Sequence, residues 1–304
     1  MKKFFQFVFG FFALLILGSI VMAFVGVAAM FNLEDEHVGK SSILGLELDG
    51  VITSEHIILG QLRKYRKEDS VKGVLIRINS PGGVVGPSQE LYSEILRTRN
   101  EYKKPVVVHC ESVAASGAYY AAAAADKIVT APGCMMGSIG VLMEFVNLER
   151  LYDWAKIERY SLTTGKFKNA GAEYKPLKPE ERALFQELID DALLQFKAAI
   201  VESRGMKPEF LDQYADGRVF TGQQAVKLGF ADQVGTWDDA RKIVGNMAGL
   251  GDDPDMFEPK KRKGLRAILE EASGETHFKR VAEGLLKTQL NAQPLFLLPG
   301  AISF

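Results

Sequence analysis

Ser116 and Gly117 are the residues whose types and position best suit chemistry. They follow an apolar run, Pro105–Cys110, that is typical of a buried strand, and they precede an alanine-rich segment with high helix propensity. A serine at such a junction can present its hydroxyl above a sheet, while the free N–H groups of the first helical turn point at a bound group. Gly117 has no Cβ to block a substrate carbonyl. The pattern fits a nucleophile at Ser116, and it fits equally well with Ser112 and Ser116 as plain helix caps.

Two further small-residue turns, Pro81–Gly83 and Gly137–Gly140, also follow apolar runs that predict strands. If the strands are parallel, all three turns meet at one edge of the sheet. The N–H groups of Gly83 and Gly117 could then hold an anionic oxygen together, which is the arrangement that acyl transfer requires.

A nucleophilic serine also needs a base. No histidine lies in any of these turns, and His109 falls inside an apolar strand, where a core role is expected. A lysine remains, and because its free side chain has a pKa near 10.4, it must be desolvated or placed in positive potential to act as a base. The spacing alone does not choose among the loop lysines, which are Lys166, Lys168, Lys175 and Lys178.

The composition excludes several classes of function. The formal net charge of -1 gives no indication of nucleic-acid binding. Cys110 and Cys134 lie among apolar or small residues and indicate buried thiols rather than a disulfide framework. The four histidines are scattered without ligand spacing, so we expect neither a metal site nor a cofactor.

The N-terminal region predicts a membrane anchor. No charged residue occurs in Phe4–Phe31, and a helix of that length reaches about 42 Å, enough to cross an apolar bilayer core of about 30 Å. Lys2 and Lys3 precede this segment and Glu34–Glu36 follow it, which favours a cytoplasmic N-terminus. A cleaved signal peptide, with Gly26–Ala28 as a weak small-residue site, is the alternative.

The rest of the chain alternates strand and helix patterns, which predicts an α/β fold with mainly parallel strands and function at the strand ends. We expect strands at 42–52, 71–78, 106–109 and 127–131, a further strand from Tyr160 running into a polar loop, and a turn, capped helix and strand over 217–232. We expect helices at 54–65, 148–154 and 179–204, with Leu184, Leu188, Leu193 or Leu194 and Ile200 sharing the inner face of the last.

Four regions follow from these patterns: a membrane anchor (1–33), a linker (34–42), one catalytic domain (43–250) and a C-terminal tail (251–304). The tail contains a basic cluster, Lys260–Lys263, which is either solvated or in contact with anionic lipid. Helical periodicity extends over Arg266–Leu290. The apolar end, Leu295–Phe304, is too short to span a bilayer, and we hypothesise that it enters the substrate groove of a neighbouring subunit.

Five motifs together resemble the signal peptide peptidase A family of S49-type serine proteases, in its short form with one N-terminal anchor. The motifs are Asn79–Gly83, Ser112–Tyr120, Gly137–Val141, Gly165–Asn169, and Gly217–Gly222 with Gly229–Asp232. They follow the family's order and cover roughly residues 43–235.

The resemblance implies a ClpP/crotonase-like α/β fold and a serine peptidase with a Ser-Lys dyad. Ser116 matches the nucleophile and Lys168 the general base, whereas Lys166 does not match. Ser138 matches a serine that orients the lysine amine. Gly83 and Gly117 match the oxyanion-hole amides, in agreement with the reading of the turns.

The resemblance also implies substrates and assembly. Family members degrade signal peptides left after secretion, cutting them in their apolar part, and form ring-like homo-oligomers in which neighbouring subunits help to build the sites. The chain would sit in the cell (inner) membrane with its catalytic domain on the outer side. A crotonase-type acyl-CoA enzyme and a non-catalytic membrane scaffold are the alternative functions.

Overall fold

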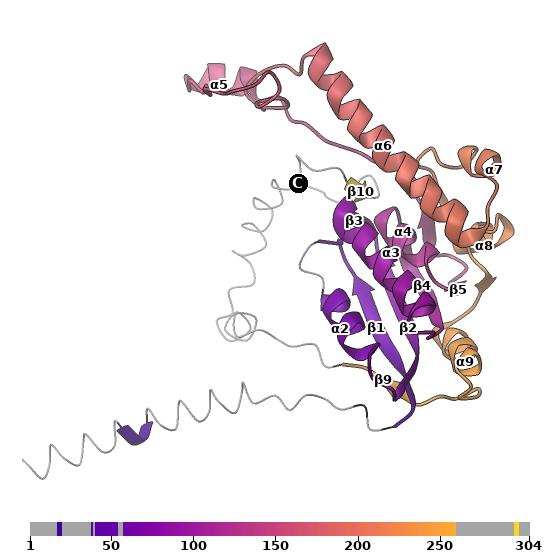
Figure 1. Cartoon of the computed structure of the whole chain (residues 1–304). Helices are drawn as coiled ribbons and strands as arrows, with labels where there is room; N and C mark the ends of the chain where they lie inside the picture. Colours follow the sequence, from indigo (N-terminus) through magenta and orange to yellow (C-terminus); the bar gives the residue numbers. More distant parts are fainter. Residues whose placement is uncertain (1–16, 20–37, 39, 54–56, 260–294, 298–304) are drawn as a thin grey trace, which may run out of the picture. The chain divides into compact units, whose positions relative to one another are not determined.

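The computed structural model describes residues 17–19, 38, 40–53, 57–259 and 295–297 (Figure 1). The chain divides into two compact units, Met1–Gly39 and Lys40–Phe304. In the first, Leu17–Ser19 are helical. Within the described ranges, no helix combines the length and the apolar character needed to cross a membrane. Most of the expected anchor, Phe4–Phe31, lies outside the described residues.

The second unit is built on an eight-stranded sheet in which all pairs but one are parallel. The order along the sheet is β7-β6-β4-β2-β1-β9, and β5 lies between β4 and β8. Among the described strands of this sheet, β6 and β7 alone pair antiparallel. The strands are β1 (Ser42–Asp49), β2 (Val71–Ser80), β4 (Val106–Ala115), β5 (Lys127–Thr130), β6 (Met135–Gly137), β7 (Val219–Thr221), β8 (Gln233–Val234) and β9 (Met256–Phe257). A second, two-stranded sheet consists of β3 (Gly82–Val84) and β10 (Leu295–Leu297).

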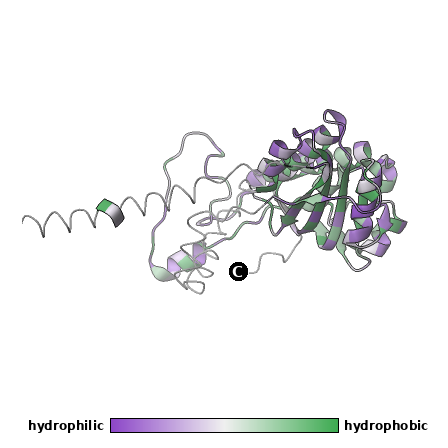
Figure 2. Ribbon diagram, turned by 90° about the horizontal axis from the view of Figure 1, so that it is seen from below, coloured by the Kyte–Doolittle hydropathy of each residue, from purple (hydrophilic) through white to green (hydrophobic). Residues whose placement is uncertain are grey.

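Helices cover both faces of the sheet, as expected when parallel strands are joined by crossover helices (Figure 1). The helices are α2 (Ile57–Tyr65), α3 (Val85–Asn100), α4 (Gly117–Ala123), α5 (Glu149–Ala155), α6 (Pro179–Arg204), α7 (Pro208–Asp212), α8 (Gly222–Lys227) and α9 (Trp237–Met247). On one face, Ala240 and Val244 of α9 pack on Ile43, Leu75 and Val107. Figure 2 shows the strands as the hydrophobic centre, with hydrophilic residues concentrated on the helices around them. The predicted α/β architecture is therefore confirmed.

The sheet also extends beyond the expected domain. Met256 and Phe257 of β9 pair with Ile43 and Leu44 of β1, so residues past 250 form part of the central sheet. Residues 260–294 and 298–304, with the basic cluster and the helical periodicity of the tail, lie outside the described residues.

The strand predicted from Tyr160 is wrong. Residues 157–163 have no regular secondary structure, and Tyr160 and Leu162 are 81% and 95% exposed. A strand requires a neighbouring strand for its backbone hydrogen bonds, and this segment runs with α5 at the end of α6 that lies away from the sheet (Figure 1). An apolar sequence alone could not show that such a neighbour is missing.

The inner face of α6 also differs from the prediction, although its bounds agree. Leu188 and Leu194 are exposed, whereas the buried apolar residues are Ala192, Phe196, Ala199 and Ile200. These four residues lie in the C-terminal half of α6, where small alanines allow close approach and the centre of the Phe196 ring lies 4.7 Å from that of the Tyr120 ring on α4. The N-terminal half projects beyond this contact.

Candidate active site

Ser116 occupies a strained turn between β4 and α4. β4 ends at Ala115 and α4 begins at Gly117, so the serine stands at the junction that the sequence predicts. Its backbone has φ 53° and ψ −118°, a conformation that non-glycine residues rarely adopt. The residue is fully buried, and its Oγ has no hydrogen-bond partner among the described residues. It makes no side-chain cap bond to α4, so the plain helix-cap reading fails for Ser116.

The turn at Gly137 holds Ser116 in place. The N–H of Ser116 donates to the Gly137 carbonyl at 2.7 Å, and Ala115 pairs with Gly137 across β4 and β6. The next residue, Ser138, is also buried with a positive φ of 51°, and its N–H donates to the Arg218 carbonyl at 2.7 Å. The structure therefore brings two of the three predicted turns together by direct backbone contact.

The third turn places Gly83 on β3, which packs against α4. The N–H of Val84 donates to the Ile52 carbonyl at 2.9 Å, and the N–H of Ile52 donates to Gly82 at 2.8 Å. Because backbone groups alternate sides along a strand, the N–H and C=O of Gly83 point away from Ile52. A Cβ at Gly83 would lie 2.1 Å from the Ile52 carbonyl oxygen, so only glycine fits between the two segments.

The C-terminal strand β10 occupies the side of β3 toward which Gly83 points. The two strands are antiparallel, with Phe296 opposite Gly83 and Leu295 opposite Val84. β10 also packs against α4, the helix that begins after Ser116. An extended peptide therefore fits alongside β3 at the predicted oxyanion-hole residue. Sequence reasoning placed the tail in a groove only on its apolar composition, because strand pairing over three residues leaves no periodic signal.

A cavity of about 300 Å³ opens beside Ser138. One wall is the loop after β6, with Gly140, Val141 and Leu142, and the other is α6, with Ile189 and Leu193. Gln186, Asp190 and residues 215–217 complete the lining. The sequence did not indicate this cavity, because its walls come from segments far apart in the chain.

The structure does not bring Lys168 to Ser116 within one chain. Lys168 is exposed on the segment between α5 and α6, and Lys166 beside it forms an ion pair with Glu180 in the first turn of α6, at 3.4 Å. From Glu180 to Phe196, where α6 contacts α4, the helix extends roughly 24 Å. Figure 1 shows the segment between α5 and α6 at the end of α6 that lies away from the sheet, and Ser116 Oγ has no hydrogen-bond partner among the described residues, so the two side chains are not bonded in one chain.

The buried titratable side chains on and beside β4 are packed in the protein core. His109 packs edge-on against Trp237 at 6.0 Å between ring centres, and burial lowers its pKa. Cys110 and Cys134 are buried free thiols, as predicted, and burial raises the pKa of Cys134 to about 11. Thiols with a raised pKa are poor nucleophiles at neutral pH. The described residues hold no cluster of His, Cys, Asp and Glu that could bind a metal ion.

Comparison with known proteins agrees with this geometry. The sequence pattern of peptidase family S49 matches residues 98–251, and that of Clp protease matches residues 43–136. The chain belongs to peptidase family S49. This S49 membership makes the protein a serine peptidase, and the Clp protease match together with the mainly parallel sheet confirms the ClpP-like part of the predicted fold.

The alignments with individual S49 relatives cover different fractions of this chain and of each relative. A provisionally named protease of Synechocystis sp. is 36% identical over 72% of this chain and 78% of that protein. A protein of Enterococcus faecium, provisionally named signal peptide peptidase SppA, is 30% identical over 68% of this chain and 63% of that protein. The chloroplastic serine protease SPPA of Arabidopsis thaliana is 35% identical over 64% of this chain, but this covers only 28% of the plant protein.

Proposed function

We propose that this S49 peptidase is a membrane-anchored endopeptidase with Ser116 as its nucleophile. The buried, unpartnered Ser116 hydroxyl in a strained strand-to-helix turn carries the proposal, because backbone strain of this kind is maintained at functional sites. The Oγ attacks the peptide carbonyl carbon while a lysine amine accepts its proton. The N–H groups of Gly83 and Gly117 hold the resulting oxyanion.

Lys168 is the proposed base, and Ser138 orients its amine. After the first attack, the lysine passes the serine proton to the leaving amine and an acyl-enzyme ester remains. The lysine then accepts a proton from the water that attacks the ester, and this proton returns to Ser116 Oγ as the acyl group leaves. Ser116 and Ser138 are both buried, so an amine that reaches them enters a site shielded from water.

The amine comes from a neighbouring copy of the chain in this proposal. Lys168 is exposed and makes no hydrogen bond to Ser116 in one chain, and the segment with Lys168 exposes large apolar side chains, including Trp154, Tyr160 and Leu162. Soluble surfaces rarely expose such a group of residues without a partner. The ring-like homo-oligomer expected from the family would cover these side chains and deliver Lys168 to the next copy.

The proposed substrates are apolar peptides, with remnant signal peptides as the physiological class. Support comes from the E. faecium relative, whose name refers to signal peptides, and from the apolar β10 segment alongside Gly83. An N-terminal helix at Phe4–Phe31 would anchor the protein, with its N-terminus in the cytoplasm. The catalytic domain, predicted at 43–250 and extended by β9 to Phe257, would lie on the outer side of the cell membrane. A peptidase held at this surface meets its substrates where secretion leaves them.

Mixing two inactive variants tests the proposal. Ser116→Ala and Lys168→Ala should each abolish cleavage of an apolar signal peptide. After joint dissociation and reassembly, about a quarter of the sites would combine a serine from one copy with a lysine from the next, and activity should return to about that fraction of the wild type. Products are mapped by mass spectrometry.

Three other outcomes would contradict different parts of the proposal. Inactive mixtures beside an active wild type would place the dyad within one copy. Wild-type-like cleavage by Lys168→Ala would eliminate the assigned base, and thioester hydrolysis without peptide cleavage would favour the acyl-CoA alternative.

A further inference from the structure

Lys168 lies on a segment between α5 and α6 that has no helix or strand over residues 157–178. The backbone makes turn hydrogen bonds, such as the one from the Lys168 N–H to the Gly165 carbonyl at 3.4 Å, but it forms no ladder with another strand. A side chain on such a loop is placed precisely only where further contacts lock the loop. The contacts around Lys168 therefore decide whether the segment can present a base.

A first set of contacts centres on Glu173 and joins the two ends of the loop. The Glu173 carboxylate forms an ion pair with Arg159 and accepts a hydrogen bond from the Tyr152 hydroxyl of α5 at 3.1 Å. The Glu173 carbonyl accepts from the N–H of Leu148, directly before α5, at 2.6 Å. Residue 173 is thus held both to α5 and to the outgoing chain at residue 159.

A second cluster of side chains reaches the residue next to Lys168. The hydroxyls of Tyr174 and Ser161 share a hydrogen bond of 2.8 Å. The Asn169 amide donates to the Ser161 hydroxyl at 3.4 Å and to the Tyr174 hydroxyl at 3.5 Å. The bonds from Ser161 and Asn169 lower the pKa of Tyr174. This cluster closes the loop 161–169 and includes the immediate neighbour of the proposed base.

The side of the loop that carries Tyr174 is also fixed to α6. Lys175 forms an ion pair with Glu181 in the first turn of α6, whose side chain is only 3% exposed. Gly171 packs so closely that a Cβ there would lie 2.5 Å from the Phe145 ring and 3.3 Å from that of Phe185. The Tyr174 hydroxyl therefore connects a well-anchored stretch to the exposed loop with Lys168.

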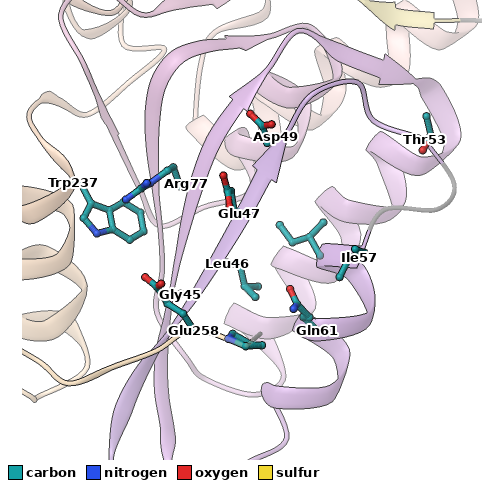
Figure 3. Close-up of a pocket in the computed structure, with 12 residues that line it drawn as sticks. Gly45, Leu46, Glu47, Asp49, Thr53, Ile57, Gln61, Arg77, Trp237 and Glu258 are labelled. Atoms are coloured by element: carbon teal, nitrogen blue, oxygen red, sulfur yellow. The ribbon is translucent and has the colours of Figure 1, made fainter. Parts of the chain in front are cut away.

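A cavity of about 520 Å³ beside β1 offers no other means of placing this loop. Figure 3 shows its lining from β1 and α2, with Arg77 and Trp237 on the other side. The Arg77 guanidinium stacks on the Trp237 ring, 4.3 Å from the ring centre. None of residues 157–178 lines the cavity, so a group bound there would not touch the loop.

We propose that Tyr174 is a positioning residue for the general base, because its hydroxyl holds the loop 161–169 through Ser161 and Asn169. This role rests on the proposed function, in which Lys168 acts on Ser116 of a neighbouring copy. A loop that is shaped before the copies meet loses less conformational freedom when its lysine reaches the serine. Tyr174 acts through Asn169, so its loss should lower kcat and leave KM unchanged.

Mixed assemblies test this role because they place Tyr174 in a chosen chain. In the mixture of inactive variants, the Ser116→Ala chain supplies Lys168 and the Lys168→Ala chain supplies Ser116. Adding Tyr174→Phe to the Ser116→Ala chain should lower the restored kcat about three- to tenfold, with KM unchanged within twofold. The same change in the Lys168→Ala chain should leave the restored kcat unchanged. Equal losses in both arrangements would indicate a merely structural role and overturn the proposal, as would no loss in either.

Single variants of the full-length protein decide the matter if the mixtures are inactive. Tyr174→Phe keeps the ring under the Arg159 guanidinium and should lower kcat about three- to tenfold. Ser161→Ala should have a similar effect, and the double variant should lose no more, because both changes remove the same bond. Thr163→Ala is the matched control, since it removes an exposed hydroxyl of the same loop outside the cluster, and it should leave kcat unchanged.

The outcomes separate this role from the proposed function. An inactive Lys168→Ala beside a Tyr174→Phe variant with wild-type kcat would overturn the positioning role alone. Losses in the double variant that multiply would also overturn it, because the two hydroxyls would then act independently. An active Lys168→Ala would remove the base itself, and the role of Tyr174 with it.

Discussion

Phe296 lies opposite Gly83 in the antiparallel pair of β10 and β3, on the side of β3 toward which the Gly83 N–H points. The same N–H is the proposed oxyanion donor. The C-terminal strand thus occupies backbone positions that an extended substrate would need beside Ser116.

Removal of this strand should activate the peptidase. We expect deletion of residues 295–304 to raise kcat/KM for an apolar fluorogenic peptide by about three- to tenfold, because the free site would no longer compete with the tail. Deletion of 298–304 alone keeps β10 and should have a smaller effect. Equal kcat/KM for all three chains would show that β10 does not compete with substrate.

Gly83→Ala should inactivate the enzyme. The new Cβ would meet the Ile52 carbonyl at 2.1 Å and displace β3, and loss of one oxyanion donor typically lowers kcat by 10²–10³-fold. Gly86→Ala, in the first turn of α3, is the matched control, because nothing outside the backbone of its own helix lies within 4 Å of a Cβ built there, and it should retain activity. Similar kcat values for both variants would refute the assigned role of Gly83.

Glycine and alanine at position 116 should differ in stability although both are inactive. The backbone at φ 53° costs any residue with a Cβ on the order of 1–3 kcal/mol, and glycine avoids part of this strain. We expect Ser116→Gly to unfold at a higher denaturant concentration than Ser116→Ala, with the same m value. A less stable glycine variant would mean that the turn is not strained.

Asp232 should make the free energy of unfolding depend on pH in the acidic range. Burial alone would raise its pKa, but the Ile128 N–H and the Arg204 guanidinium, both at 2.8 Å, outweigh burial and lower the pKa. A lowered folded-state pKa means that the stabilisation is complete above the usual carboxyl pKa of about 3.9 and is lost as the pH falls below it. The difference in unfolding free energy between wild type and Asp232→Asn should therefore be largest at pH 5–7 and shrink toward pH 3. A constant difference across this range would contradict the assignment.

The sequence predicted most of the strands and helices of the domain, because the hydrophobic pattern of each segment matches the structure that the segment forms. The bounds of α6 agree with the sequence prediction, and Ser116 lies at the predicted junction of β4 and α4. β4 runs on through Ala115, beyond the apolar run that predicted it, because Val113–Ala115 pair with β6. Pairing between distant segments, rather than composition, sets that end.

The sequence alone could not predict where Lys168 lies relative to Ser116. Motif resemblance assigns the residue a role, but its distance from Ser116 depends on how far α6 extends and on what covers Trp154 and Leu162. The pairing of β10 with Gly83 was equally hidden, because a three-residue apolar segment has no distinct period. Both features depend on tertiary or quaternary contacts between segments far apart in sequence.

Helix α6 has the geometry of a lever, because its buried apolar residues, from Ala192 to Ile200, all lie in its C-terminal half. From Ala192 to Pro179 the helix extends roughly 20 Å, so a tilt of about 10° at Ala192 would shift its tip by roughly 3 Å. That displacement equals about one hydrogen-bond length. Small changes in packing between Phe196 and Tyr120 would thus be magnified at the loop that carries Lys168.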